Sequence, residues 1–142
     1  MARALGADLA IYVGASDPAE AIREATNGRG ADVVFEAVGS TATVAQSLAV
    51  VRTGGNLTWI GNAAPTVELP MQDMVTRELT LRGSYAFAGE FDEAIDLLAT
   101  GRLDVRPLIE LTASLDDAPD IFRRLGDGTL DAIKVVLVPS GP

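Results

Sequence analysis

The stretch ADVVFEAVGS, Ala31 to Ser40, decides the fold. Residues 33–39 form a β-branched, aromatic and nearly continuous apolar run, which predicts a strand buried on both faces. Ser40 follows at a position that caps a helix, and Val44 and Leu48 begin the apolar stripe of that helix. A strand that leads directly into a helix is the repeating unit of a parallel α/β sheet.

The same alternation extends on both sides of this stretch. Asp17 is a capping residue followed by proline, which favours a helix start, and Gly54-Gly55 is a pair that ends helices. The further predicted elements are a strand at 9–13, a helix from 18, a strand at 57–61, a short helix at 71–77 and a strand at 79–85. This order predicts a parallel, doubly wound sheet with helices on both faces.

The last third of the chain has a different pattern. It predicts an amphipathic helix at 91–98, a short strand at 108–111, a helix after Ser114 and a final strand at 133–138. We place the boundary between the two parts near residues 85–90.

Composition excludes several classes of function. The chain has no cysteine and no histidine, which removes disulfides, thiolate metal sites and the usual general base. A net charge of −9 repels phosphate backbones, so we expect no nucleic-acid partner. No apolar run approaches the roughly 20 residues of a membrane span, so we expect no membrane association and a cytoplasmic location.

Six segments occur in an order that resembles one known family. They are ALGAD (4–8), GRGADVVFEAVGS (28–40), VVRTGGNLTWIGN (50–62), ELTLRGSYAF (78–87), FDEAIDLLATGRLDVRPLIE (91–110) and AIKVVLVP (132–139). Over essentially its whole length the chain resembles the C-terminal part of the medium-chain dehydrogenases, the zinc alcohol dehydrogenase superfamily. The resemblance implies that 1–86 is the C-terminal part of a Rossmann-type dinucleotide-binding domain. It implies that 87–142 is a helix and strand segment that returns to the catalytic domain.

Other parts of that family are not found in these residues. The resemblance implies an N-terminal catalytic domain that holds the active-site zinc, and a first strand-helix-strand with the glycine-rich phosphate loop. The chain contains no G-x-G-x-x-G. Gly28-Arg29-Gly30 is not that loop, because a predicted helix precedes it and a strand follows it, whereas the motif requires the reverse order. We therefore expect a fragment that holds no metal ligand and no catalytic residue of its own.

Two turns at strand ends are candidate cofactor contacts, since ligands of open α/β sheets bind at the carboxyl ends of strands. By resemblance, Val38-Gly39-Ser40 lies near the nicotinamide ribose. The alternative is a plain strand-to-helix turn with Ser40 as its cap. By resemblance, the backbone of Ile60-Gly61-Asn62 approaches the nicotinamide ring, and a glycine permits that approach. The alternative is a tight turn that leaves the strand.

Two further candidates come from the resemblance. The backbone of Ser84 and Ala86, in Ser84-Tyr85-Ala86, would hydrogen-bond the nicotinamide carboxamide, while Tyr85 itself is interpreted as a packed aromatic. Lys134 would contribute a cation to the cofactor pyrophosphate, with a solvent-facing strand residue as the alternative. Glu36, a carboxylate inside an apolar strand, needs a partner, hydrogen bonds or water.

The resemblance implies part of an oxidoreductase that transfers hydride between an alcohol, polyol or carbonyl substrate and NAD or NADP. This chain would supply the nicotinamide side of the cleft, would be inactive alone and would bind the cofactor weakly or not at all. Dimeric members pair through the edge strand that corresponds to Leu79–Tyr85, which implies a homodimer. The alternatives are a non-catalytic dimerisation or interaction module, the zinc-free quinone-reductase branch, and an unrelated doubly wound domain with a small-molecule cleft.

Overall fold

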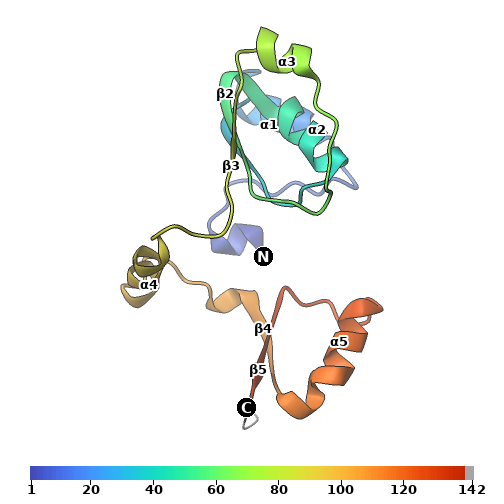
Figure 1. Ribbon diagram of the computed structural model, residues 1–142, viewed down its shortest axis with the longest axis vertical. Helices are drawn as coiled ribbons and strands as arrows, with labels where there is room; N and C mark the ends of the chain where they lie inside the picture. Colours follow the sequence, from blue (N-terminus) through green and yellow to red (C-terminus); the bar gives the residue numbers. More distant parts are fainter. Residues whose placement is uncertain (140–142) are drawn as a thin grey trace. The chain divides into compact units, whose positions relative to one another are not determined.

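The computed structural model describes residues 1–139 and divides into two compact units. One unit is Ile11–Phe87, and the other combines Met1–Ala10 with the chain from Ala88 onward (Figure 1). We call them the sheet unit and the terminal unit. The last three residues of the segment 87–142 lie outside the described part. The assignment of 1–86 and 87–142 to two domains of a larger protein stays a prediction.

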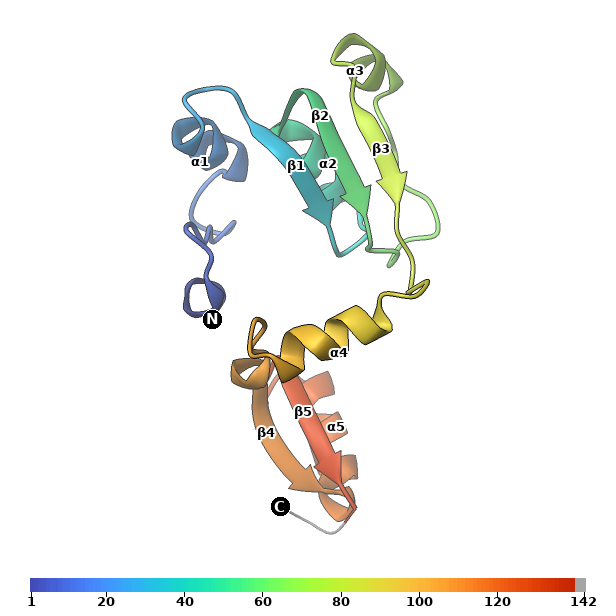
Figure 2. The same cartoon turned by 90° about the vertical axis from the view of Figure 1, so that its left-hand side faces the viewer.

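The sheet unit has three parallel strands in the order β1-β2-β3. The strands are β1 (Ala31–Glu36), β2 (Val51–Trp59) and β3 (Thr80–Gly83), and the helices are α1 (Pro18–Ala25), α2 (Thr41–Val50) and α3 (Met71–Thr76). Figure 2 shows the three strands running in one direction with α2 behind them. The α/β class and the parallel pairing predicted from the alternation of elements are confirmed.

Helix starts follow the residues that the sequence analysis identified. The Asp17 carboxylate accepts a hydrogen bond from the Ala19 N–H at 2.9 Å and caps α1. Ser40 caps α2 through a reciprocal capping box with Thr43. At the other end of α2, the Arg77 guanidinium donates to the carbonyls of Leu48 and Val51, which satisfies acceptors that the helix leaves unpaired.

The core of the sheet unit lies between α2 and one face of the sheet. Val44 and Leu48 of α2 pack with Val51 and Leu57 of β2, and all four are buried. The prediction that the strand at 33–39 is buried on both faces is wrong, because Phe35 is 67% exposed and Val33 is also exposed. The prediction of helices on both faces of the sheet is also wrong for the described residues. The helices α1 and α2 contact each other and α2 contacts β1, whereas the face of the sheet that carries Val33 and Phe35 is exposed.

One predicted strand is missing in the described part of the chain, and one predicted helix ends earlier than expected. Residues 9–13 form no strand, because a strand needs a neighbour to complete its hydrogen bonds and β1 pairs only with β2 in the described sheet. Gly54-Gly55 does not end α2. The helix ends at Val50, β2 begins at Val51 without a loop, and the glycine pair lies inside β2 at an irregularity in its pairing with β1.

The terminal unit has a second parallel pair, β4 (Ile109–Ser114) and β5 (Lys134–Val138), joined through α5 (Ala118–Gly126). It also contains α4 (Phe91–Ala99) and three short 3-10 turns at 2–5, 106–108 and 115–117. Its buried apolar residues are Ala113 and Ile121. No helix among residues 1–139 is both long enough and apolar enough to cross a membrane.

Candidate functional site

The three strands of the sheet unit end at one edge of the sheet, because they are parallel and adjacent (Figure 2). The Glu36 carbonyl at the end of β1 accepts from the N–H groups of Ile60 and Gly61 at 2.8 and 3.1 Å. The Trp59 carbonyl at the end of β2 accepts from the Ser84 N–H at 2.9 Å. The structure therefore places the three strand-end segments in register: 38–40, 60–62 and 84–86 follow neighbouring strands. We call these nine residues the strand-end surface.

Two glycines allow the first two turns to touch. A Cβ atom at Gly61 would overlap the backbone of Val38 and Gly39, and a Cβ at Gly39 would overlap the backbone of Gly61 and Asn62. Gly39 also has a φ of 81°, in the left-handed region that favours glycine. Carbonyls of Val38 and Gly39 accept from the N–H groups at 63 and 64, at 3.2 and 2.9 Å, which joins the turns further. Close backbone approach, rather than a side-chain contact, defines this part of the surface.

Most polar groups of the first turn are already bonded within the protein. Glu36 accepts from the N–H groups of Val38 and Gly39, their carbonyls are also paired, and the Ser40 side chain belongs to the capping box. A ligand would therefore meet the turn 38–40 mainly through van der Waals contact. Both interpretations of Ser40 given above remain compatible with its capping role.

The third segment, residues 84–86, differs from the first turn because two of its N–H groups have no partner within the described residues. The Ser84 N–H is paired with Trp59, so this donor is not available to a ligand. Within the described residues no hydrogen bond reaches the N–H groups of Tyr85 and Ala86 or the side-chain amide of Asn62. Ala86 has a φ of 53°, which is uncommon for a residue with a side chain, and Tyr85 is 84% exposed rather than packed. The interpretation of Tyr85 as a packed aromatic is therefore wrong.

Glu36 is the residue whose role the sequence analysis did not identify. It is 4% exposed, and its Oε1 lies 2.9 Å from the nitrogens of Val38 and Gly39, while its Oε2 lies 2.9 Å from Gly39. Burial raises the pKa of Glu36, but hydrogen bonds from Gly39, the Thr43 hydroxyl and Val38 outweigh burial and leave the pKa below its ordinary value. The sequence offered one indication, an acid inside an apolar run with a glycine three residues later, but this indication did not identify the partners of the carboxylate.

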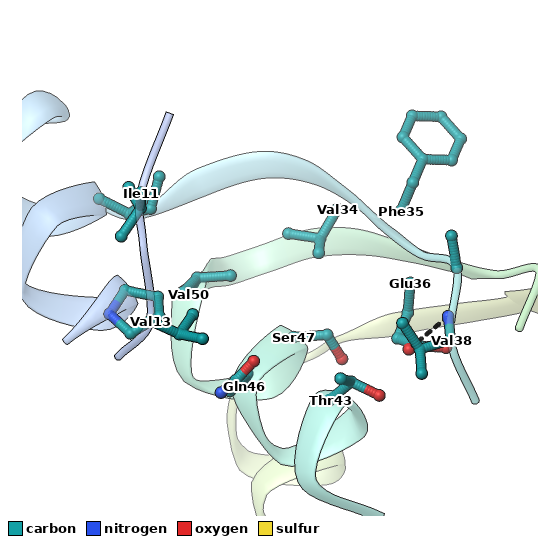
Figure 3. A pocket seen from close by; sticks show the side chains of 13 residues that line it. Ile11, Val13, Val34, Phe35, Glu36, Val38, Thr43, Gln46, Ser47 and Val50 are labelled. Carbon is teal, nitrogen blue, oxygen red and sulfur yellow. Dashed lines mark hydrogen bonds between the residues drawn. The ribbon is translucent and has the colours of Figure 1, made fainter. Parts of the chain in front are cut away.

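A pocket of about 330 Å³ lies on the helix side of β1, beside Glu36 (Figure 3). Its lining is mostly apolar, with Val34 and Val38 from β1 and the following turn, Ile22 from α1 and Val50 from α2. A second hollow, of about 630 Å³, lies over the open face of the sheet and includes Ser84. Each thus includes one residue of the strand-end surface, Val38 or Ser84, and neither includes Gly39 or Gly61.

Lys134 lies in the terminal unit. It is the first residue of β5, pairs in register with Ile109 and is exposed. Its predicted contact with a cofactor pyrophosphate stays a prediction. For metals, the described residues contain no group of three or more Asp, Glu, His or Cys side chains that could hold an ion.

A family model, a curated relative and a solved structure that match this chain all carry the names of dehydrogenases or reductases. The family model described as "Zinc-binding dehydrogenase" matches residues 1–100. D-xylulose reductase from Saccharomyces cerevisiae is 29% identical over 117 residues, which cover 82% of this chain and 33% of the yeast protein. The alcohol dehydrogenase TADH from Thermus sp. ATN1 superposes with a TM-score of 0.87 at 33% identity, over 96% of this chain and 39% of that structure.

A structure from Sinorhizobium meliloti 1021 that was solved bound to NADP superposes with a TM-score of 0.81 at 32% identity. That match covers 97% of this chain and 41% of the solved one. The chain spans about a third of the length of the curated relatives it matches.

Proposed function

The chain belongs to the zinc-binding dehydrogenase family, and from this premise we propose that it supplies the nicotinamide side of the cofactor cleft in an NAD- or NADP-dependent oxidoreductase. The substrate is an alcohol, a polyol or the corresponding carbonyl compound. The observation that carries the proposal is the strand-end surface, in which Gly39 and Gly61 meet next to Ser84-Tyr85-Ala86 at the carboxyl ends of parallel strands.

The residues of this surface fit the nicotinamide half of the cofactor. The meeting of two glycines leaves a surface of backbone that a flat ring can approach closely. The N–H groups of Tyr85 and Ala86, which are unpaired within the described residues, suit the carbonyl of a carboxamide. When bound, the nicotinamide accepts or gives up the hydride, and the part of this chain is to orient its ring.

The strand-end surface itself offers no group that fits the pyrophosphate half of the cofactor or a zinc ion. The 142 residues contain no glycine-rich phosphate loop, no histidine and no cysteine. We propose that the isolated chain binds the cofactor weakly and performs no turnover. The contact of Lys134 with the pyrophosphate, the choice between NAD and NADP and the cytoplasmic location stay predictions.

A titration with the two halves of the cofactor tests the proposal. We expect reduced nicotinamide mononucleotide to bind the chain with a dissociation constant on the order of millimolar, and AMP not to bind in the same range. Equal binding of both, or of neither, would contradict the assignment of this surface. Hydride transfer by the purified chain with added zinc and a polyol panel would contradict its inactivity.

A second function, as a dimerisation module, rests on β3. In the described sheet β3 pairs only with β2, so the outer edge of Thr80–Gly83 has no partner strand. An open strand edge is a template for pairing with a second copy, and we propose a homodimer through Leu79–Tyr85. Light scattering over a concentration series measures the mass. A constant 14.8 kDa at the highest concentration would exclude the homodimer.

A further inference from the structure

Glu36 joins two turns of the strand-end surface through different groups. Its carboxylate accepts from the N–H groups of Val38 and Gly39 at 2.9 Å. Its main-chain carbonyl accepts from Ile60 and Gly61 at 2.8 and 3.1 Å. Because a Cβ at Gly61 would overlap Val38 and Gly39, the two turns touch, and a shift of the first turn toward Gly61 would displace the second.

Among the described residues that line the pocket beside Glu36, no other side chain carries a charge. Around the pocket beside it, α1 contributes Pro18 and Ile22, and α2 contributes Thr43, Gln46, Ser47 and Val50. None of these side chains is titratable. Backbone N–H groups, which can only donate, therefore balance the carboxylate. A glutamine at this position would direct an NH₂ group toward donors.

We propose that Glu36 is the positioning residue of the strand-end surface: its carboxylate holds the turn 38–40 against Gly61. The identity of the ligand rests on the proposed function, but the coupling between the turns does not. Glu36 touches no ligand itself. It acts through the backbone of Gly39 and Gly61, which the ligand would meet.

Amide hydrogen exchange in Glu36→Gln tests the coupling. Gly61 is the decisive reporter, because its N–H bonds a main-chain carbonyl that the substitution keeps. We expect exchange at Gly61 to accelerate at least about tenfold more than exchange at Leu57 in the core. A merely structural role would accelerate both amides by the same factor, and this result would overturn the proposal. Glu24→Gln, an exposed carboxylate on α1, is the matched control and should change neither amide.

Glu36→Asp keeps the charge and carries the test if Glu36→Gln fails to fold. Where both variants fold, Glu36→Asp should accelerate amide exchange at Gly61, relative to exchange at Leu57, by a smaller factor than Glu36→Gln does. An unchanged Gly61 to Leu57 ratio in Glu36→Asp would overturn the proposal where only that variant folds. These measurements need no nucleotide. Failure of the wild-type chain to bind nicotinamide mononucleotide would therefore contradict the proposed function alone.

A separate observation concerns the end of α1. The Gly28 N–H donates to the Arg23 carbonyl at 2.7 Å and the Asn27 N–H donates to the Glu24 carbonyl at 3.4 Å, the pattern of a Schellman motif. Asn27 is exposed and has a φ of 52°. Asn27-Gly28 is also the one sequence in the chain where asparagine precedes glycine, which presents no side chain to obstruct attack on the asparagine.

We infer that Asn27 is a deamidation site that this helix end protects. In the reaction the Gly28 nitrogen bonds to the Asn27 side-chain carbonyl carbon, and the amide nitrogen leaves as ammonia. Water then opens the cyclic imide to aspartate or isoaspartate. The folded state hinders the first step, because the Gly28 N–H is held by Arg23 and Asn27 is held in the left-handed region.

Peptide mass spectrometry after incubation at mildly alkaline pH tests this inference. We expect the one-dalton gain at Asn27 to form at least about tenfold faster in urea than in the folded chain. Asn56 and Asn62, which precede leucine and alanine, are internal controls and should react more slowly than Asn27 in urea. Gly28→Ala should slow the reaction in urea. Equal rates at Asn27 in the folded and unfolded chain would overturn the inference.

Discussion

The sheet unit and the terminal unit differ in what their apolar side chains contact. In the sheet unit, the stripe of α2 meets β2 and encloses a cluster in which Leu57 is 1% exposed. In the terminal unit, Ile121 is buried, but the apolar stripe of α4 stays open, with Leu98 41% exposed. Three strands and a crossover helix can enclose a core, whereas a two-stranded sheet offers little area to cover. Substitutions should therefore cost much more stability in the sheet unit.

The largest effect is expected at the meeting of the two turns. Gly61→Ala forces a Cβ into the backbone of Val38 and Gly39, and overpacking against backbone that cannot yield should cost roughly 3 kcal/mol or more. Gly83→Ala is the matched control, because a Cβ at Gly83 has no atom within 4 Å. Urea unfolding followed by the fluorescence of Trp59, the single tryptophan, measures both variants. Equal stability of the two variants would contradict the close approach.

The next effect compares the two units directly. Leu57→Ala opens a cavity in the cluster and should cost about 2–5 kcal/mol of unfolding free energy in the sheet unit. Leu98→Ala removes an exposed side chain of α4 and should change the stability by no more than about 0.5 kcal/mol. Differential scanning calorimetry measures both. A large loss in Leu98→Ala would mean that the stripe of α4 is covered in solution.

A smaller effect sharpens the comparison, because each unit has a similar capping box. Ser40 exchanges hydrogen bonds with Thr43 at the start of α2, and Ser114 does so with Asp117 before α5. Ser40→Ala and Ser114→Ala should each cost about 1 kcal/mol. Residue-resolved amide exchange should show that Ser40→Ala lowers protection within residues 11–87 and that Ser114→Ala lowers protection after residue 88. Loss spread evenly over both units would indicate that they unfold as one.

The smallest effect is expected from acid. Hydrogen bonds from Arg106 lower the pKa of Asp104 to about 2, from 3.8, and the pKa of Glu36 is lowered from 4.5. A depressed folded-state pKa gives stability that is present above the ordinary value and lost as pH falls through the lowered one. The sheet unit should therefore lose unfolding free energy below about pH 4.5, where Glu36 begins to be protonated. The exposed turn at Asp104 should lose stability only at lower pH. Glu36→Gln should flatten the first slope and Asp104→Asn only the second, in urea titrations at stepped pH.

The sequence predicted the alternation of strands and helices from residue 18 to residue 83 and two of the helix caps, because these follow from local patterns. Asp17 and Ser40 cap as expected, and the alternation of strand and helix is enough to imply parallel pairing. Burial of the 33–39 strand could not be predicted in the same way. A continuous apolar run shows that both faces favour burial, but not whether a helix is present to cover the face of Phe35.

The strand-end surface was predictable in outline and not in detail. Topology alone placed the three turns at one edge, and the glycines marked the close approach. Which N–H groups remain open depends on tertiary hydrogen bonds: Ser84 donates to Trp59, while Ala86 in the same turn does not donate within the described residues. The contacts of Glu36 were equally hidden, because its partners are backbone groups that have no sequence signal.

On the proposed function, the strand-end surface binds the nicotinamide half of NAD or NADP. Nitrogen-15 chemical-shift mapping with oxidised nicotinamide mononucleotide tests it most directly, because the method detects weak binding residue by residue. We expect saturable shifts at the amides of Gly39, Gly61 and Ala86, and no shift at Lys134 or in the rest of β5. Shifts that never saturate, or that fall elsewhere and leave these three amides unchanged, would contradict it.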